Sequence, residues 1–353
     1  MSNGSSSSLS YQNYLLYGLY VAQGLSVGAA NHLLAVAILR FEALRTSNHY
    51  LFIMAQSLAD FLNMTAYFTA GLDRILLMRD GRVKQLSTVW SCMLAPHRLL
   101  WGFFGDRLCS LMQLLISVDR LLSICFPLEY IGWSMLYPTA LSSLAYFYTF
   151  GMGALGLYLV KDRADQPISI KCTGKTVSRA GALYTRYYKL TAQIYTLLSF
   201  IVYVLVVLLY RRKVTTVVGS CDTKGEERQK QQQLAEQRRF TKSLMINCAA
   251  SVVLYLVPYS LAHLAHSVGS SSELASLAFV VSNLYPMCDI LIYSARHAEV
   301  GDAFKALLSG KAMPTDLRQW KMNDQARHDA ATSNRTTSRH GARKLIRSAW
   351  TMR

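Results

Sequence analysis

Long apolar runs separated by shorter polar segments make up most of the chain. About twenty consecutive apolar residues in a helix are enough to cross the hydrocarbon core of a bilayer. Seven runs reach about that length, at residues 14–39, 50–72, 95–126, 131–160, 190–210, 244–264 and 274–293. The pattern predicts an all-α membrane protein, built as a bundle of seven transmembrane helices.

The third run is the most polar of the seven. It contains Arg98, Asp106 and Arg107 before it reaches Asp119 and Arg120. Charged side chains within a membrane helix are costly unless they face the interior of the protein. We therefore expect this helix to lie at the centre of the bundle, surrounded by the others.

The flanks of the first run predict the orientation of the chain. The residues before it carry no charged side chain, whereas Arg40 and Arg45 follow it. Basic residues favour the cytoplasmic side, so the N-terminus is expected outside and, after seven spans, the C-terminus inside. Residues 1–13 are then an extracellular N-terminus without the basic start of a cleaved signal peptide. Asn3, in an Asn-Gly-Ser motif, would be accessible to glycosylation.

The residues after the seventh run divide into two parts. Val300, Phe304, Leu307 and Leu308 recur at helical spacing between charged residues, which predicts a short amphipathic helix at the membrane surface. The transmembrane domain is expected to span residues 14–308. Residues 309–353 are polar and basic, with few large apolar side chains, and are predicted to be a disordered cytoplasmic tail.

Composition supports a membrane protein. Only 16% of the residues are charged and 52% are hydrophobic, whereas soluble domains are about a quarter charged. The net charge of +17 would suit a nucleic-acid partner, but apolar blocks interrupt the basic stretches until the tail. We expect contact with membrane lipid and no nucleic-acid partner.

The sequence contains no recognisable catalytic or metal-binding motif. Its seven cysteines form no CxxC pair and are not accompanied by a histidine cluster, so a zinc site is not expected. No nucleophile–base set or phosphate-binding loop stands out. The sequence predicts neither an enzyme nor a bound cofactor.

Several short motifs fall in order on the predicted spans. They are Asn31 in the first, Ser57-Leu58-Ala59-Asp60 in the second, Asp119-Arg120-Leu121 followed by Pro127 and Tyr130 after the third, Pro258 in the sixth, and Asp289 to Tyr293 in the seventh. This set resembles rhodopsin-like seven-transmembrane G-protein-coupled receptors. The short N-terminus, the stretch VDRLLSICFPLEY and the ending ILIYSARHAEVGDAF resemble the nematode chemosensory serpentine receptors, most closely class sx, over residues 14–308.

The chain also departs from better-known receptors. Leu121 stands where a Tyr commonly follows the Asp-Arg pair, and Asp289 stands where relatives have the Asn of an Asn-Pro pair. No Trp precedes Pro258 in the sixth span. The fold implied by the resemblance is unaffected, but the details of activation are expected to differ.

The resemblance implies a G-protein-coupling switch at the inner side, made by Asp119, Arg120, Tyr130 and Tyr293. Asp119 would neutralise Arg120 at rest, and outward movement of the sixth helix would free Arg120 to contact the G-protein. A purely structural ion pair is the alternative. Arg238 occupies the position near the inner end of the sixth helix that often supplies a second acid. We therefore expect Arg120 to be held by Asp119 alone, with basal activity as a consequence.

In the family arrangement Asn31, Asp60 and Asp289 would meet in the middle of the bundle. Two carboxylates close together in a medium of low dielectric cannot both ionise cheaply. A water or sodium site is one hypothesis, and a protonated, hydrogen-bonded pair is the other.

The resemblance also implies a disulfide between Cys92 and Cys172, which ties the third helix to the second outer loop. Two free thiols are the alternative. Cys92 precedes Arg120 by about one helical turn more than is usual in relatives.

Asp106 is about 20 Å above Arg120 if both lie on one helix, at a depth that faces the ligand cavity in relatives. The proposed pocket consists of Asp106, Arg107, Tyr187, Tyr188, Tyr259, His263 and Asn283. Alternatively, Asp106, Arg107 and Arg98 satisfy one another within the bundle. Peptide, volatile and lipid-like ligands are all compatible with the sequence.

These features predict a plasma-membrane chemoreceptor that binds an extracellular ligand and activates a heterotrimeric G-protein. The alternative is a small multi-helix transporter or ligand-gated channel. Transporters of that kind often contain repeated halves, and no internal repeat is found in this sequence.

Overall fold

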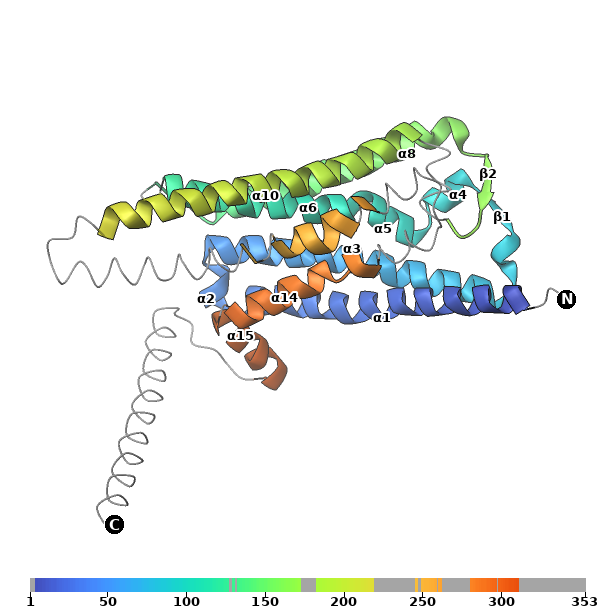
Figure 1. Cartoon of the computed structure of the whole chain (residues 1–353), viewed down its shortest axis with the longest axis horizontal. Helices are drawn as coiled ribbons and strands as arrows, with labels where there is room; N and C mark the ends of the chain where they lie inside the picture. Colours follow the sequence, from blue (N-terminus) through green and yellow to red (C-terminus); the bar gives the residue numbers. More distant parts are fainter. Residues whose placement is uncertain are drawn as a thin grey trace, which may run out of the picture.

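Helices dominate the computed structural model, which describes residues 4–126, 129–130, 132–172, 182–218, 245–246, 249–258, 260–261, 280–296 and 298–310. The long helices lie side by side in an elongated bundle (Figure 1). The α-helices are, in chain order, α1 (Gly4–Arg40), α2 (Glu42–Arg45), α3 (Asn48–Arg79), α4 (Val89–Met93), α5 (Pro96–Phe104), α6 (Asp106–Cys125), α8 (Leu136–Val160), α10 (Ala182–Val218), α14 (Tyr285–Arg296) and α15 (Ala298–Ser309).

Four helices in the described part of the chain are long and apolar enough to cross a membrane: Asn13–Arg40, Pro96–Cys125, Leu136–Arg163 and Leu190–Arg212. They correspond to the first, third, fourth and fifth predicted runs. The second run forms α3, which has 32 residues but buries several polar side chains that lower its hydropathy. The sixth and seventh runs are described only in part.

Glycines bring α1 and α3 close together. A Cβ atom added to Gly24 would lie 2.6 Å from the backbone nitrogen of Phe68, and one added to Gly71 would lie 2.8 Å from the carbonyl oxygen of Tyr17. Small residues are common where membrane helices pack backbone to backbone. These two positions therefore fix the first helix pair of the bundle.

The third predicted run is not the single helix that the sequence suggested. α5 ends at Phe104 and α6 begins at Asp106, with Gly105 between them at a ψ of −148°, far from helical values. Asp106 consequently lies in the first turn of α6. The exposed N–H groups and the helix dipole favour an acidic side chain at that position.

One end of the bundle carries a small antiparallel sheet that the sequence analysis did not predict. Strand β1 (Leu86–Thr88) pairs with β2 (Pro167–Ser169), with Ser87 opposite Ile168. The 3-10 turns η1 (Arg82–Lys84) and η2 (Lys161–Arg163) lie in the same two loops. Figure 1 shows the sheet at the end that holds the N-terminus, opposite α2 and α15.

The predicted short helix after the last span is present as α15. Val300, Ala303 and Ala306 on one face of it are buried in a cluster that includes Leu34 and Ile38 of α1. Leu308 is 66% exposed. The apolar side of α15 therefore packs partly against the carboxyl-terminal part of α1.

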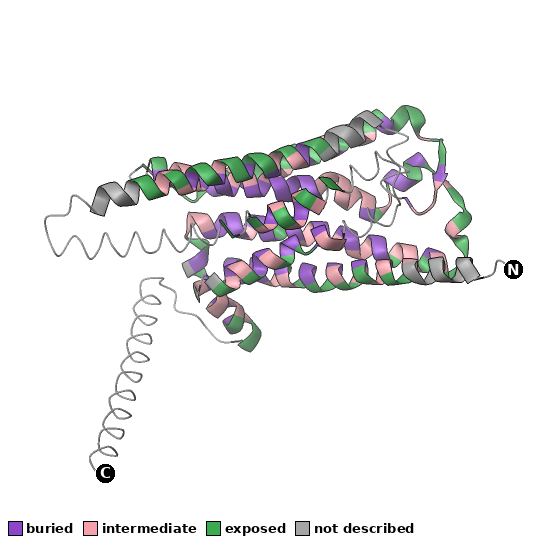
Figure 2. Cartoon of the chain, in the orientation of Figure 1, coloured by how far each residue is buried: buried purple, intermediate pink, exposed green. Residues whose placement is uncertain are grey.

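Large apolar side chains cover much of the outside of α8 and α10. Phe147 is 74% exposed, Leu144 64% and Ile201 54%. Figure 2 shows these two helices exposed along much of their length. Soluble proteins rarely expose such a continuous apolar surface, so this face suits contact with lipid.

Candidate functional site

The carboxyl-terminal part of α6 carries a closed group of three polar side chains. Arg120 donates from Nε to Oδ2 of Asp119 at 2.9 Å and from Nη2 to the hydroxyl of Tyr130 at 3.1 Å. The Tyr130 hydroxyl in turn donates to Oδ1 of Asp119 at 2.9 Å. The Asp119 side chain is 1% exposed and that of Arg120 is 13% exposed. Each of the three side chains is therefore hydrogen-bonded to the other two.

This geometry corrects the expectation that Asp119 alone would hold Arg120. Tyr130 is a second partner through its hydroxyl, and its ring centroid lies 5.9 Å from the guanidinium carbon of Arg120. Tyr130 itself packs against Trp133, with ring centroids 5.4 Å apart. The loop after α6 thus contributes directly to the restraint of Arg120.

Burial keeps the Tyr130 phenol protonated. It raises the pKa of this group above its ordinary value; Arg120 opposes the shift, and the neighbouring Asp119 adds to it. The hydroxyl therefore remains a hydrogen-bond donor to Asp119 throughout the physiological pH range.

Tyr293, the fourth member of the expected coupling switch, lies in a separate apolar cluster with residues of α2 and α15. It is 1% exposed and packs in the apolar cluster that contains Leu34, Tyr50 and Val300. It thereby joins the end of α14 to α1, α3 and α15.

Asn31, Asp60 and Asp289 are all buried, with exposures of 1%, 0% and 2%. Gln56 donates from Nε2 to both carboxylate oxygens of Asp60, at 3.1 and 3.2 Å. Asn31 donates to the Val27 carbonyl of its own helix at 3.1 Å.

Cys109 of α6 lies at the centre of the buried acids. Its thiol hydrogen bonds with Asp60 and is close enough to Asp106 and Asp289 for both to act on it electrostatically. No sequence motif predicted a role for Gln56 or Cys109. The only sequence signal for this cluster is helical spacing. Gln56 lies one turn before Asp60, and Cys109 lies one turn after Asp106.

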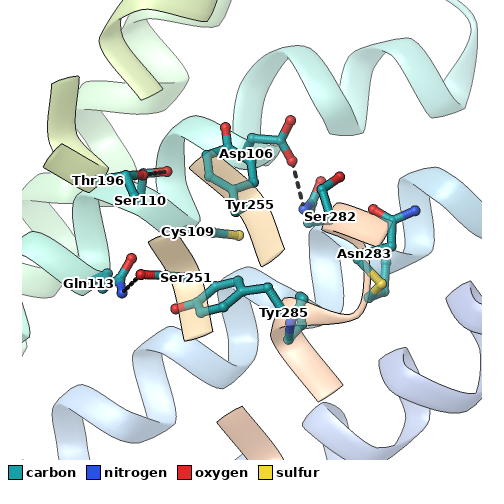
Figure 3. A pocket seen from close by; sticks show the side chains of 13 residues that line it. Asp106, Cys109, Ser110, Gln113, Thr196, Ser251, Tyr255, Ser282, Asn283 and Tyr285 are labelled. Atoms are coloured by element: carbon teal, nitrogen blue, oxygen red, sulfur yellow. Dashed lines mark hydrogen bonds between the residues drawn. The ribbon is translucent and has the colours of Figure 1, made fainter. Parts of the chain in front are cut away.

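A small cavity with both polar and apolar walls lies between α3, α6, α10, the segment around Ser251 and Tyr255, and the residues before and at the start of α14 (Figure 3). It has about 20 Å³ of room, which is enough for about one water molecule. Its walls are formed by Asn63, Met64, Asp106, Cys109, Ser110, Gln113, Thr196, Ser251, Tyr255, Ser282, Asn283, Tyr285 and Pro286.

Hydrogen bonds between helices hold the walls of this cavity. Gln113 donates to the Ser251 hydroxyl at 2.7 Å, and Thr196 donates to that of Ser110 at 3.1 Å. Ser251 immediately precedes the π-helical turn η3 (Val252–Leu256), and such turns often occur at functional sites. α6 is thereby connected to α10 and to the η3 segment.

Of the seven expected pocket residues, Asp106 and Asn283 line the cavity. Asp106 is 7% exposed and accepts from Nδ2 of Asn63 at 3.1 Å. Arg107 donates to the Gly102 carbonyl of α5 at 3.2 Å.

The other residues predicted from the sequence lie where the structure describes no side chain. Tyr187 and Tyr188 lie on α10, but their side chains are not described. Tyr259, His263, the glycosylation candidate Asn3 and residues 311–353 of the expected tail lie outside the described residues.

The disulfide implied by the resemblance is present between Cys92 and Cys172. Cys92 lies on α4, a separate short helix before α5, which accounts for the extra turn between this cysteine and Arg120. Arg98 donates to the Cys172 carbonyl at 2.6 Å, and Arg74 donates to that of Lys171 at 3.4 Å. The loop between α8 and α10 is therefore attached to the bundle by a covalent bond and by two arginines.

The fold and these sites define a multi-pass helical membrane protein with the marks of a receptor. A family model described as Serpentine type 7TM GPCR chemoreceptor Srsx matches residues 26–292. Because the match covers more than half of the chain, the protein belongs to this family of seven-transmembrane chemoreceptors. No curated protein matches the chain.

Proposed function

We propose that the protein is a plasma-membrane chemoreceptor that binds an extracellular ligand and activates a heterotrimeric G-protein. The observation that carries this proposal is the closed group of Asp119, Arg120 and Tyr130. A largely buried arginine with two hydrogen-bond partners at the end of a membrane helix suits a switch that is restrained at rest. The family match favours this function over a transporter or a channel.

The topology of the proposal has seven spans and an extracellular N-terminus. The sheet and the Cys92–Cys172 disulfide lie at the end of the bundle that holds the N-terminus, and disulfides form in oxidising compartments. In this topology α15 and the group of Asp119, Arg120 and Tyr130 lie at the opposite end, where a cytoplasmic G-protein would bind.

Activation in this proposal is a shift between two states of one bundle. At rest Asp119 and Tyr130 satisfy Arg120; in the active state the sixth helix moves outward and Arg120 contacts the G-protein. A ligand shifts the equilibrium only as far as it binds one state better than the other. Tyr293, which packs with residues of α1, α3 and α15, would move with α14.

For Asn31, Asp60 and Asp289, which are each buried, we keep a shared water or sodium site as the proposal. Oδ1 of Asn31 and Oε1 of Gln56 are buried acceptors without a partner in the described part of the chain. A carboxylate together with neutral oxygens suits Na⁺ or water. In the same part, no three His, Cys, Asp or Glu side chains are grouped in a way that would hold a metal ion.

The proposed binding site for the extracellular ligand is the central cavity. Asp106 and Asn283 line it, and we retain Arg107, Tyr187, Tyr188, Tyr259 and His263 as pocket candidates.

Two measurements test the proposed function. An epitope tag at Ser2 should be detected on intact cells, and a tag visible only after permeabilisation would contradict the receptor topology. A ligand screen that records cyclic nucleotide and calcium in parallel should find compounds that signal through the wild type and not through Arg120→Ala. Compounds that are transported or conducted without any G-protein response would favour the transporter or channel instead.

A further inference from the structure

We propose that Asn48 is a positioning residue for the group of Asp119, Arg120 and Tyr130. By holding the chain at Trp133, it keeps the Tyr130 hydroxyl against its two partners in the resting state. This inference rests on the proposed receptor function and specifies how its resting state is maintained.

Asn48 connects two segments that are far apart in the sequence. It is the first residue of α3, and its Nδ2 donates to the carbonyl of Trp133 at 3.1 Å, 85 residues further along the chain. Because a carbonyl oxygen only accepts, the amide nitrogen of Asn48 is the atom that faces it. The hydrogen bond therefore ties the segment after α6 to the start of α3.

The indole ring of Trp133 contacts two tyrosine rings. Its centroid is 5.4 Å from that of Tyr130 and 4.6 Å from that of Tyr137. Tyr137 in turn packs edge-to-face with Phe52 of α3, with ring centroids 5.9 Å apart, and Phe52 is 1% exposed. Aromatic pairs favour arrangements of this kind. Trp133 is thus connected to α3 through its carbonyl and through its ring.

The backbone near Tyr130 forms short turns. The Tyr130 N–H donates to the Phe126 carbonyl at 2.9 Å, and the Trp133 N–H donates to the Tyr130 carbonyl at 3.2 Å. Hydrogen bonds over three or four residues fix the shape of a turn but not its position relative to a distant helix. Because Trp133 is bonded to Tyr130 in this way, a displacement of Trp133 is transmitted to Tyr130.

The hydroxyl of Tyr130 tolerates little displacement. It lies 2.9 Å from Oδ1 of Asp119 and 3.1 Å from Nη2 of Arg120. The second distance is already near the upper end of the usual range for a hydrogen bond, so a shift of about 1 Å would break at least one of the two. Loss of the hydrogen bond between Asn48 and Trp133 should therefore weaken the restraint on Arg120.

Basal G-protein signalling of the full-length receptor, normalised to surface expression, measures this effect. Asn48→Ala should raise it by about three- to tenfold, as expected for one hydrogen bond between neutral groups. Thr46→Ala is the matched control, because the Thr46 hydroxyl also donates to a carbonyl at 3.1 Å, but to that of Glu42 in its own turn. Wild-type signalling in Asn48→Ala, under conditions where Tyr130→Phe raises it, would contradict the role of Asn48.

A role that acts through Tyr130 predicts non-additive effects. In a receptor that already carries Tyr130→Phe, adding Asn48→Ala should change basal signalling by less than about twofold, because the hydroxyl that Asn48 positions is absent. A purely structural role would not depend on this hydroxyl. If Asn48→Ala raises signalling by the same factor in both backgrounds, Asn48 does not act through Tyr130 and the proposal is overturned.

Asn48→Asp separates positioning from stability, and it replaces Asn48→Ala if that variant does not fold. An ionised carboxylate cannot donate to the Trp133 carbonyl, whereas an acid in the first turn of α3 interacts favourably with the helix dipole. This variant should therefore keep or raise the Tm of the receptor in lipid nanodiscs and still raise basal signalling. A receptor in which Tyr130→Phe signals and Asn48→Asp stays at the wild-type level would refute the positioning role.

Hydrogen exchange in nanodiscs without a G-protein distinguishes this inference from the proposed function. The backbone N–H groups of Tyr130 and Trp133 should exchange faster in Asn48→Ala than in Thr46→Ala or the wild type. Faster exchange, with unchanged signalling in both Asn48→Ala and Tyr130→Phe, would contradict the coupling function and leave the positioning role intact. Unchanged exchange would overturn the inference and leave the proposed function intact.

Discussion

Tyr130 donates its phenolic hydrogen to Asp119 at 2.9 Å, across eleven residues and around the end of α6. The same hydroxyl accepts from Arg120 at 3.1 Å. Arg120 is consequently restrained from two sides. The basal activity expected from the sequence, where Asp119 was the only identified partner, is therefore replaced by the expectation of low basal activity.

Replacing Tyr130 with Phe should raise basal G-protein signalling. The change removes hydrogen bonds to two charged groups, each of which contributes about 1.5–3 kcal/mol, and should shift the resting equilibrium by about tenfold or more. Basal signalling, normalised to the amount of receptor at the cell surface, is the measurement.

Tyr137→Phe is the matched control for Tyr130→Phe. It makes the same chemical change at a tyrosine that packs on Trp133, with ring centroids 4.6 Å apart. Its hydroxyl has no hydrogen-bond partner within the described residues. If Tyr130→Phe shows the same basal signalling as Tyr137→Phe, the Tyr130 hydroxyl does not restrain the receptor in its resting state.

The disulfide should stabilise the folded receptor. Cys172→Ser is expected to lower the free energy of unfolding by about 2–4 kcal/mol, measured by thermal unfolding in detergent or nanodiscs. Cys125→Ser, at an exposed cysteine outside the disulfide, serves as the control. Reducing agent should lower the Tm of the wild type and have no effect on Cys172→Ser, and the opposite pattern would indicate that the two thiols are free.

The close approach of α1 and α3 should depend on Gly24. A methyl group there would lie 2.6 Å from a backbone atom of α3, whereas one at Gly18 meets nothing within 4 Å. Gly24→Ala is expected to destabilise by about 1–3 kcal/mol through overpacking. Gly18→Ala should be neutral or slightly stabilising. Equal Tm values for the two variants would show that the helices do not pack as described.

A cation at the buried acids should make ligand binding dependent on sodium. The dependence is expected to disappear in Asp60→Asn, which keeps the size of the side chain and removes its charge. Titration of an active ligand at varied sodium concentration and constant ionic strength measures this. A sodium effect of the same size in Asp60→Asn would exclude Asp60 as the site.

The length of the apolar runs was sufficient to predict the helical class and the helices α1, α8 and the apolar part of α10. The motif residues of α6 and the pairing of Cys92 with Cys172 followed from the resemblance. These features are encoded locally, by run length and by residues at fixed positions on the spans. The break at Gly105 was missed because a single glycine in an apolar run does not change its hydropathy.

Contacts between distant segments could not be predicted from the sequence. β1 and β2 have three residues each, too few for an alternating pattern, and lie in separate polar loops. Gln113 and Ser251 are 138 residues apart, and their hydrogen bond depends on how the helices are rotated. The contact between Tyr130 and Asp119 depends on the path of the chain after α6, which helical spacing does not describe.

The most direct test of the account combines Arg120→Ala with Tyr130→Phe and measures basal G-protein signalling and surface expression together. No ligand is needed, because the single Tyr130→Phe variant supplies the signal. The account predicts that the double variant reaches the surface as the single variant does and that its signalling falls to the level of cells without receptor. Signalling maintained at the level of Tyr130→Phe would contradict the assignment of Arg120 as the residue that couples this receptor to its G-protein.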